Sequence, residues 1–457
     1  MFGDKAKGSV SVCRESPKNR KDIEQQSRPS LHIEILSFIL CITSPLSVIF
    51  YCIAYHHFDT SLYAAARAAY SEGFFYFFAT RFPRPSLISV SCYAAWLALQ
   101  AILYVCLPGE IALGPVTPAG RRLKYKLNGL TAWCLTVAIW AVGTKSGLVD
   151  PTIIARNWEG LIWTTTVFCV VAALISYAKA CVLPGVETEN LKTGLFWYDF
   201  FGGVELHPRI GELWDWKHFL SSRTGGIITW TVIDLSFAAS QYQTYGYLTN
   251  TMVVVVFLRG WVVVDYFINE EWFFHTLDGM YEGFGFYNIY GFSGMMPVFW
   301  TLQTQYLAKH PKEMSPLALA CIMAMYAIGW CVRFTADYQK LRFRQIGGKY
   351  SIWGKNAKGI RASYQTADGK VRESLLLSSG WWGLARHANY TGSSIYTWAL
   401  CALCGYGGVF TCTEAIVLAF LQIHRCYRDE AKCAAKYGEH WDEYCRQVPW
   451  RMIPGVF

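Results

Sequence analysis

The sequence has few charged residues for its length. Only 16% of its 457 residues are Asp, Glu, Lys or Arg, whereas soluble proteins average about 25%. Hydrophobic residues make up 53% of the chain and aromatic residues 16%. This composition excludes an ordinary set of soluble domains and favours a membrane protein.

Familiar nucleotide and hydrolase motifs are also missing. The chain contains no GxGxxG turn, no Walker motif, no HExxH and no GxSxG, and the glycine-rich stretch at 283–291 lacks the required spacing. A phosphate-bearing ligand would therefore have to be held by side chains from separate segments.

Paired cysteines are absent as well. The 16 cysteines are scattered through apolar runs, and the single CxxC, Cys401 to Cys404, has no second half. We therefore expect buried, reduced thiols and no metal site. The net charge of +9 could suggest nucleic acid, but the basic residues flank apolar runs, so membrane orientation explains them and no nucleic-acid partner is expected.

Long apolar runs recur along the chain. They occupy residues 35–55, 85–107, 127–142, 161–182, 225–245, 251–268, 284–307, 316–332 and 395–423, most of them near the ~20 residues that cross a bilayer. The last run is long enough for two spans or a hairpin. We predict an all-α polytopic membrane protein with about ten transmembrane helices.

Charge predicts the orientation. Residues 1–33 are polar and basic, without a cleavable signal peptide, and are predicted to form a disordered cytosolic tail before one membrane domain at 34–457. The segment 333–372 has ten basic residues and two acidic ones, which by the positive-inside rule places it and both termini in the cytosol. Its second half is predicted to form a hairpin that turns at Asp368-Gly369.

Several cations could meet at one membrane face. Lys340 and Arg344 have i, i+4 spacing, which suits a phosphate, and Arg386, Arg425 and Lys436 follow in two polar clusters at 375–392 and 424–445. Contact with lipid headgroups explains these cations equally well. The acid Asp429 fits lipid less well, although it could simply pair with Arg425.

Acidic residues inside apolar segments are costly and point to function. They are Asp234, Asp265, Glu270, Asp278, Glu282 and Glu414, of which Asp265 lies most centrally in an apolar run.

The chain from about Leu107 onward resembles the sterol reductase family of the endoplasmic reticulum. The resemblance rests on long ordered segments, including LPGE, GGVELHPRIG, QKLRFRQIGGKYSIWGK, SLLLSSGWWGLARHANYTG and RDEAKCAAKYGEHWDEYC. It implies a multi-pass protein of that membrane, a sterol substrate drawn from the bilayer lipids, and a cytosol-facing NADPH site formed mostly by residues 340–457. Other sterol-biosynthesis enzymes are expected as partners.

The resemblance also assigns cofactor contacts. They are Lys340, Arg344, Leu377, Trp382, Asn389, Tyr390, Arg425, Asp429, Cys433, Lys436, Tyr437 and Tyr444. The implied reaction protonates a sterol double bond and then transfers hydride to the carbocation. Asp265, Tyr266, Glu270 and Asp278 are candidates for the proton donor. IWGK followed by RASYQTADG is similar to the Δ7 branch.

The chain departs from the family pattern on the sterol side. The unusual residues are Glu282, Phe292, Trp300, Ala388, Ser393 and the stretch ending at Glu414. They leave three alternatives to Δ7 reduction: reduction of another double bond such as Δ14, action on another polycyclic terpenoid, and a non-catalytic sterol-binding homologue. An isoprenylcysteine-methyltransferase-like enzyme is disfavoured, because its bundle is smaller and Ala388 interrupts its RHPxY element.

Overall fold

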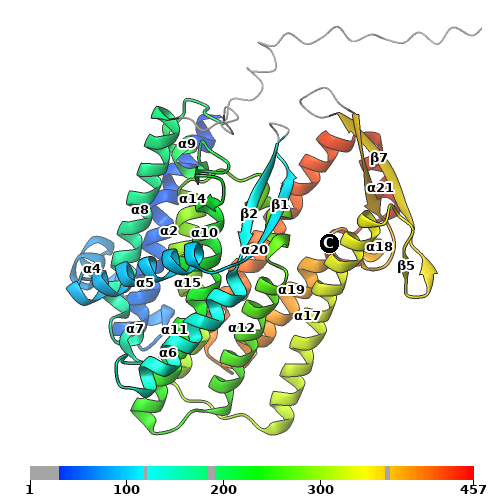
Figure 1. Ribbon diagram of the computed structural model, residues 1–457. Helices are drawn as coiled ribbons and strands as arrows, with labels where there is room; N and C mark the ends of the chain where they lie inside the picture. Colours follow the sequence, from blue (N-terminus) through cyan, green and yellow to red (C-terminus); the bar gives the residue numbers. More distant parts are fainter. Residues whose placement is uncertain (1–29, 118–120, 184–190, 366–370) are drawn as a thin grey trace, which may run out of the picture.

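A computed structural model describes residues 30–117, 121–183, 191–365 and 371–457. It shows a helical bundle from which antiparallel hairpins project at one end (Figure 1). The long helices are α2 (Leu31–His57), α5 (Leu87–Cys106), α6 (Gly129–Lys145), α8 (Trp158–Val182), α11 (Ile227–Tyr245), α12 (Asn250–Ile268), α17 (Pro316–Gln345), α19 (Ala388–Ala402) and α20 (Gly408–Tyr437).

The membrane character of the bundle is confirmed in its main part. Six helices of the described chain are long and apolar enough to cross a bilayer: α2, α5, α8, α12, α17 and α20. α6 has 17 residues and α19 has 15, so both are shorter than these six. The count of ten spans stays a prediction. α2 begins at Leu31, slightly before the predicted end of the polar tail.

The apolar run at 284–307 is not one helix. It is divided into α14 (Phe286–Tyr290), the π-helical turn η3 (Gly291–Met295), α15 (Met296–Phe299) and α16 (Leu302–Lys309). The run begins where the backbone at Gly283 and Gly285 meets that of Gly203, too closely for any Cβ atom. The single span predicted here was wrong, because apolar composition alone does not report such breaks.

The sequence pattern also missed two short helices, α3 (Leu62–Glu72) and α4 (Phe74–Arg81), which lie at the outer edge of the bundle (Figure 1). α3 is rich in alanine and α4 in phenylalanine. Each is too short to cross a bilayer, so the search for long apolar runs passed over them.

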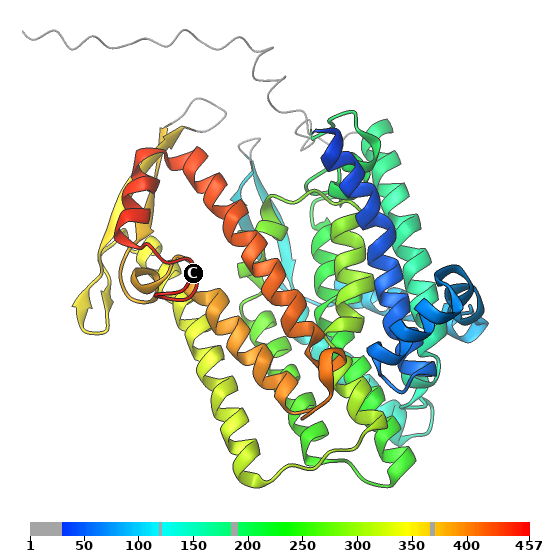
Figure 2. The same cartoon turned by 180° about the vertical axis from the view of Figure 1, so that it is seen from behind.

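The C-terminal half contains a tightly packed helix pair. α17 and α19 meet at two glycines: a Cβ on Gly329 would lie 2.6 Å from the Tyr396 nitrogen, and one on Gly392 would lie 2.5 Å from the Arg333 nitrogen. Only glycine permits this approach. α20 runs back along the pair toward the hairpin end of the molecule (Figure 2).

The beginning of the basic segment is helical, not a loop. α17 continues to Gln345, so residues 333–345 extend the helix beyond the predicted span. The hairpin expected after it is confirmed, with β7 (Gly359–Gln365) paired antiparallel to β8 (Val371–Leu377). The proposed turn at 368–369 lies outside the described residues. A smaller hairpin, β5 (Ser351–Ile352) and β6 (Lys355–Asn356), precedes it.

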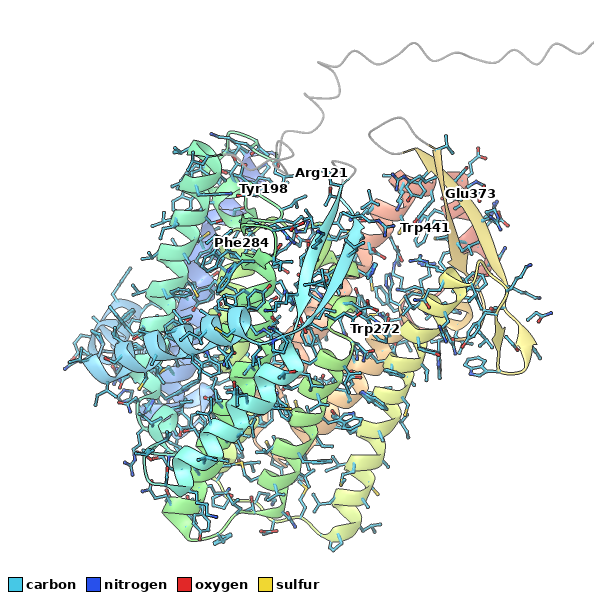
Figure 3. All side chains as sticks on the ribbon, viewed as in Figure 1. Arg121, Tyr198, Trp272, Phe284, Glu373 and Trp441 are labelled. Carbon is cyan, nitrogen blue, oxygen red and sulfur yellow. The ribbon has the colours of Figure 1, made fainter. Side chains whose placement is uncertain are left out.

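Two further hairpins stand beside the bundle. β1 (Glu110–Val116) pairs with β2 (Arg122–Leu127), and the short β3 (Arg209–Ile210) pairs with β4 (Trp214–Asp215). The short α18 (Trp381–Leu384) and α21 (Glu439–Gln447) complete the C-terminal region. There Trp441 packs near β7 (Figure 3) in a small apolar cluster with Ile360 and Tyr444, separate from the main core.

Candidate functional site

The end of α17 carries the two cations predicted to bind phosphate. The Lys340 ammonium lies 4.0 Å from the centre of the Trp382 ring, and the Arg344 guanidinium donates to the Leu375 carbonyl on β8 at 3.1 Å. Trp382 is fixed by its own bond to the Ala336 carbonyl at 2.7 Å. Leu377, at the end of β8, packs in the same apolar cluster as Trp382. The structure therefore brings these four predicted residues together.

Asp429 on α20 faces this group. It interacts electrostatically with Lys340, Lys432 and Arg344, which are all cations. Among the described residues it makes no hydrogen bond or ion pair. The alternative in which it pairs with Arg425 is wrong, because Arg425 instead binds Asp278 at 2.5 Å. Asp429 thus lies among cations without being bound to one.

The remaining residues of α20 and α21 line up beside β7 and β8. Lys436 lies 4.0 Å from the centre of the Tyr364 ring, and Tyr437 donates to Ser374 at 3.4 Å. Cys433 is half-buried next to the apolar cluster that contains Ile360, Trp441 and Tyr444. Tyr444 donates to the Trp382 carbonyl at 3.3 Å, and burial raises the pKa of its phenol, which stays neutral.

The start of α19 links this region to the bundle. Asn389 donates to the carboxylate of Asp337 on α17 at 3.0 Å. The Tyr390 ring stacks on the buried His387 ring, with 5.2 Å between the ring centres. Burial, with the nearby charge of Lys340, lowers the pKa of His387 to about 3. His387 is therefore expected to be neutral at physiological pH.

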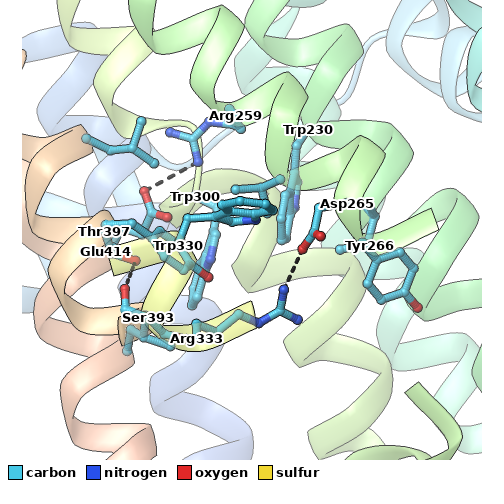
Figure 4. A pocket seen from close by; sticks show the side chains of 15 residues that line it. Trp230, Arg259, Asp265, Tyr266, Trp300, Trp330, Arg333, Ser393, Thr397 and Glu414 are labelled. Atoms are coloured by element: carbon cyan, nitrogen blue, oxygen red, sulfur yellow. Dashed lines mark hydrogen bonds and ion pairs between the residues drawn. The ribbon is translucent and has the colours of Figure 1, made fainter. Parts of the chain in front are cut away.

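A cavity of about 190 Å³ lies deeper in the bundle. It contains two ion pairs, Arg259 with Glu414 at 3.4 Å and Arg333 with Asp265 at 2.5 Å, with tryptophan side chains between them (Figure 4). The lining residues include Trp230, Arg259, Asp265, Tyr266, Trp300, Trp330, Arg333, Ser393, Thr397 and Glu414. The volume is below the roughly 300 Å³ at which ligand pockets usually begin, so the cavity as it stands is too small for a whole polycyclic molecule.

One arginine connects the cavity to the predicted cofactor residues. Arg333 pairs with Asp265 on the cavity wall and also with Asp337 at 3.6 Å. Asp337 in turn accepts from Asn389 and interacts with Lys340. A continuous polar path therefore runs from the Asp265 end of the cavity to the predicted NADPH residues.

The four candidate proton donors separate into two pairs. Asp265 and Tyr266 line the cavity, and the Tyr266 hydroxyl has no hydrogen-bond partner in the described part of the chain. Glu270 lies outside the cavity, where it accepts from His218, Arg223 and the Gly129 backbone at 3.0–3.2 Å. Asp278 is bound to Arg425. Asp265, Glu270 and Asp278 thus all have cationic partners, and of the four candidates only Asp265 and Tyr266 line the cavity.

Three of the departures meet in this cavity. Trp300, Ser393 and Glu414 all line it, although they come from three different segments. Glu282 is instead bound to Arg428 at 2.6 Å, Phe292 packs against the Phe273 cluster, and Ala388 is buried at the start of α19.

Sequence reasoning overlooked Arg259 and Arg333. Arg259 is a lone arginine in the apolar run VVVVFLRGWVVVDYF, and that isolation was the available signal. Arg333 was grouped with the basic segment that follows it, although it faces the cavity.

Comparison with known proteins places this geometry in a family. The model of the ergosterol biosynthesis ERG4/ERG24 family matches residues 30–457. The chain belongs to this family. It is 38% identical to the 7-dehydrocholesterol reductase of Xenopus laevis and 36% identical to that of Danio rerio, in each case over 82% of this chain and 82% and 81% of the relative. It is 35% identical to the Delta(14)-sterol reductase of Methylotuvimicrobium alcaliphilum, over 82% of this chain and 84% of that protein.

The residues around Lys340 fit a dinucleotide cofactor. Lys340 and Arg344 are cations close to Asp429, and Lys436 lies two turns further along α20. Asp429 offers a carboxylate that has no bonded partner among the described residues, which suits a ribose or amide group. The rings of Trp382 and Tyr437 add flat apolar surfaces. These residues would hold the cofactor, which when bound supplies a hydride.

Proposed function

We propose that the protein reduces a ring double bond of a sterol at Δ7, converting a 5,7-diene to a Δ5 sterol, with NADPH as the hydride donor. Family membership and the sterol reductase names of its relatives support an enzyme that acts on a sterol C=C bond. The observation that carries the proposal is the polar path from the cavity, through Arg333 and Asp337, to the cofactor residues.

The cavity supplies what protonation of an alkene requires. The Asp265 carboxylate lies beside an apolar space walled by Trp230, Trp300 and Trp330. Tyr266 also lines this space, but its ring points away from the tryptophans (Figure 4) and its hydroxyl interacts with Glu270 and Arg223. Exclusion of water by these rings protects a carbocation until it is reduced. Arg333 orients the Asp265 carboxylate. We infer that Tyr266, whose buried hydroxyl has no hydrogen-bond partner among the described residues, donates the proton and that Asp265 positions the reacting end of the substrate.

The preference for Δ7 over Δ14 rests on the Δ7-like segment at 352–369 and on the Xenopus and Danio relatives. The Delta(14)-sterol reductase relatives, at similar identity, make Δ14 reduction the second candidate. We place the enzyme in the endoplasmic reticulum membrane with both termini in the cytosol, where it receives its sterol from the bilayer and from neighbouring sterol-biosynthesis enzymes.

Expression in yeast cells that accumulate 5,7-diene sterols tests the proposal. Sterol profiling by mass spectrometry should show conversion of the 5,7-dienes to Δ5 sterols, and a Lys340→Ala control should not convert them. Unchanged 5,7-dienes, with the protein present in the membrane, would reject Δ7 reduction. Growth rescue of cells that lack Δ14 reduction, without loss of 5,7-dienes, would establish the second candidate.

A further inference from the structure

The tip of the small β5–β6 hairpin carries a tryptophan that the turn itself does not favour. Only Trp353 and Gly354 join the two strands. Both have positive φ, 50° at Trp353 and 76° at Gly354. A two-residue turn of this kind prefers Asn or Gly, and a bulky residue at positive φ is an outlier. The Trp353 side chain is nevertheless present there and is 62% exposed.

The structure holds this ring beside the end of a membrane span. α17 begins at Pro316, and its charged residues begin at Arg333. About 20 helical residues cross the hydrocarbon of a bilayer, so the span reaches the opposite interface near Thr335. The Trp381 indole donates to the Thr335 hydroxyl at 2.8 Å, and the Trp353 ring meets the Trp381 ring edge-on, with 5.3 Å between their centres. Trp353 therefore lies at the level of the bilayer surface.

The hairpin also stands where lipid can reach it. In Figures 1 and 2 it lies outside the helical bundle, beside the C-terminal part of α17. It is at the end of the β7–β8 ribbon nearer to the bundle, because β7 starts at Gly359, directly after β6, and pairs there with Leu377. The Trp353 ring thus faces the surroundings of the bundle and not its interior.

Basic side chains surround the tip without acidic counterparts. Three exposed lysines flank the turn and make no ion pair with any residue that the structure describes: Lys349, Lys355 and Lys358. The sequence has no acidic residue between Asp337 and Asp368. Further along the ribbon, by contrast, Arg361 pairs with Glu373 at 2.7 Å. The excess of positive charge is therefore concentrated near the Trp353 turn.

We propose that the β5–β6 tip docks on an anionic bilayer surface, with the Trp353 ring among the lipid headgroups and the three lysines against anionic ones. Tryptophan is enriched at this depth because its ring is apolar and its N–H is polar. Each lysine near an anionic leaflet favours the docked state by about 5-fold. An acidic protein surface would also attract the lysines, but it would not explain a tryptophan held at the level where α17 leaves the membrane.

Docking would fix the height of the neighbouring residues above the bilayer. Trp381 is followed by Trp382, which donates to the Ala336 carbonyl at 2.7 Å and carries the Lys340 ammonium over its ring. The tip, α18 and the end of α17 are thus joined by direct contacts. This surface is distinct from the cavity and does not depend on the proposed reaction.

Photo-crosslinking of the full-length protein in nanodiscs tests the contact. Trp353→benzoylphenylalanine is compared with Val371→benzoylphenylalanine, a matched control that is 72% exposed on the same ribbon. Val371 lies about 20 Å along β8 from Leu377. The discs contain phosphatidylcholine alone or an equal mixture with phosphatidylserine, and mass spectrometry identifies the adducts. We expect lipid adducts at position 353, about 5-fold or more abundant with phosphatidylserine, and hardly any at position 371.

Two further variants separate the charge from the ring. Replacing all three lysines, as Lys349→Gln, Lys355→Gln and Lys358→Gln, should make the yield at position 353 equal in the two kinds of disc. Trp353→Asn, with the crosslinker moved to Asn356, should lower the lipid yield, and the hairpin should survive because Asn-Gly suits this turn better.

Three results would overturn the inference. They are equal lipid yields at positions 353 and 371, a yield at 353 that phosphatidylserine does not raise, and adducts only with a second copy of this chain. The readout requires neither NADPH nor sterol turnover, so an inactive protein would still give a clear result.

Discussion

The cavity and the predicted cofactor region differ in whether their charged side chains have partners of opposite charge. In the cavity, Arg259 and Arg333 bind carboxylates of the same chain, so each charged group has a partner of opposite charge before any ligand arrives. In the cofactor region, Lys340 rests on an aromatic ring and Asp429 has no bonded partner among the described residues. The first arrangement suits a neutral, mostly apolar ligand, and the second suits an anionic one.

Replacing Arg259, one of the two arginines that line the cavity, should have the largest effect on stability. Arg259→Met leaves Asp234 and Glu414 buried together without a counter-charge, which we expect to cost about 3–5 kcal/mol of folding free energy. Thermal unfolding in detergent measures this. The matched control is Arg342→Met at the exposed end of α17, which should leave the unfolding temperature within a few degrees of the wild-type value.

Removing the Tyr266 hydroxyl should lower the rate of sterol reduction without lowering the stability of the fold. Tyr266→Phe removes an unpaired proton donor, and we expect kcat for sterol reduction to fall by about 10²–10⁴-fold with an unchanged unfolding temperature. Glu270→Gln should instead lower the unfolding temperature and leave kcat nearly unchanged, because Glu270 binds three structural partners. Full activity of Tyr266→Phe would remove Tyr266 as the proton donor.

A cation of the cofactor region should affect ligand binding alone. Lys340→Ala is expected to raise the Kd for NADPH by about 10–100-fold, measured by calorimetry. Arg342→Ala, a cation half a turn along the same helix that stacks on Tyr338, is the matched control and should change this Kd little. Equal effects of the two variants would indicate general electrostatic attraction instead of a built site.

The smallest effect is expected at the stacked tryptophans. The Trp300 ring lies 6.2 Å from the Trp230 ring at an angle of 19°, a contact worth roughly 0.5–1.5 kcal/mol. Trp300→Phe should therefore raise the sterol KM by about 10-fold or less while kcat is maintained. A change in which sterol double bond is reduced would instead show that Trp300 sets the regiochemistry.

The sequence predicted the long helices well and the broken ones poorly. Helices such as α2 and α8 follow directly from uninterrupted apolar runs. The run at 284–307 is just as apolar, but its first turns depend on backbone contact between Gly203 and Gly285, which are 82 residues apart (285 − 203). Contacts at that separation leave no periodic pattern.

The two regions also differed in how far they could be predicted. The predicted cofactor contacts lie in a few compact motifs, so the family resemblance could group Lys340, Trp382 and Asp429, and the structure brings these three near one another. The cavity wall draws single residues from many helices, and Arg259 and Arg333 became significant only when folding set them against Glu414 and Asp265. A charge isolated in an apolar run was the one signal available for Arg259.

The glycine contact between α17 and α19 limits how this protein can diverge. Gly329 lies against the Tyr396 backbone, and Gly392 lies against the backbone of Arg333. Ser393, the next residue along α19, lines the cavity, and so does Tyr396 one turn later. Residues that line the cavity can be substituted one by one, and each substitution can change which substrate the protein prefers. The two glycines cannot be exchanged in this way, because a methyl group at either one would move the cavity and the cofactor residues at the same time. In a library of natural or engineered variants, the cavity should therefore vary around an invariant helix crossing.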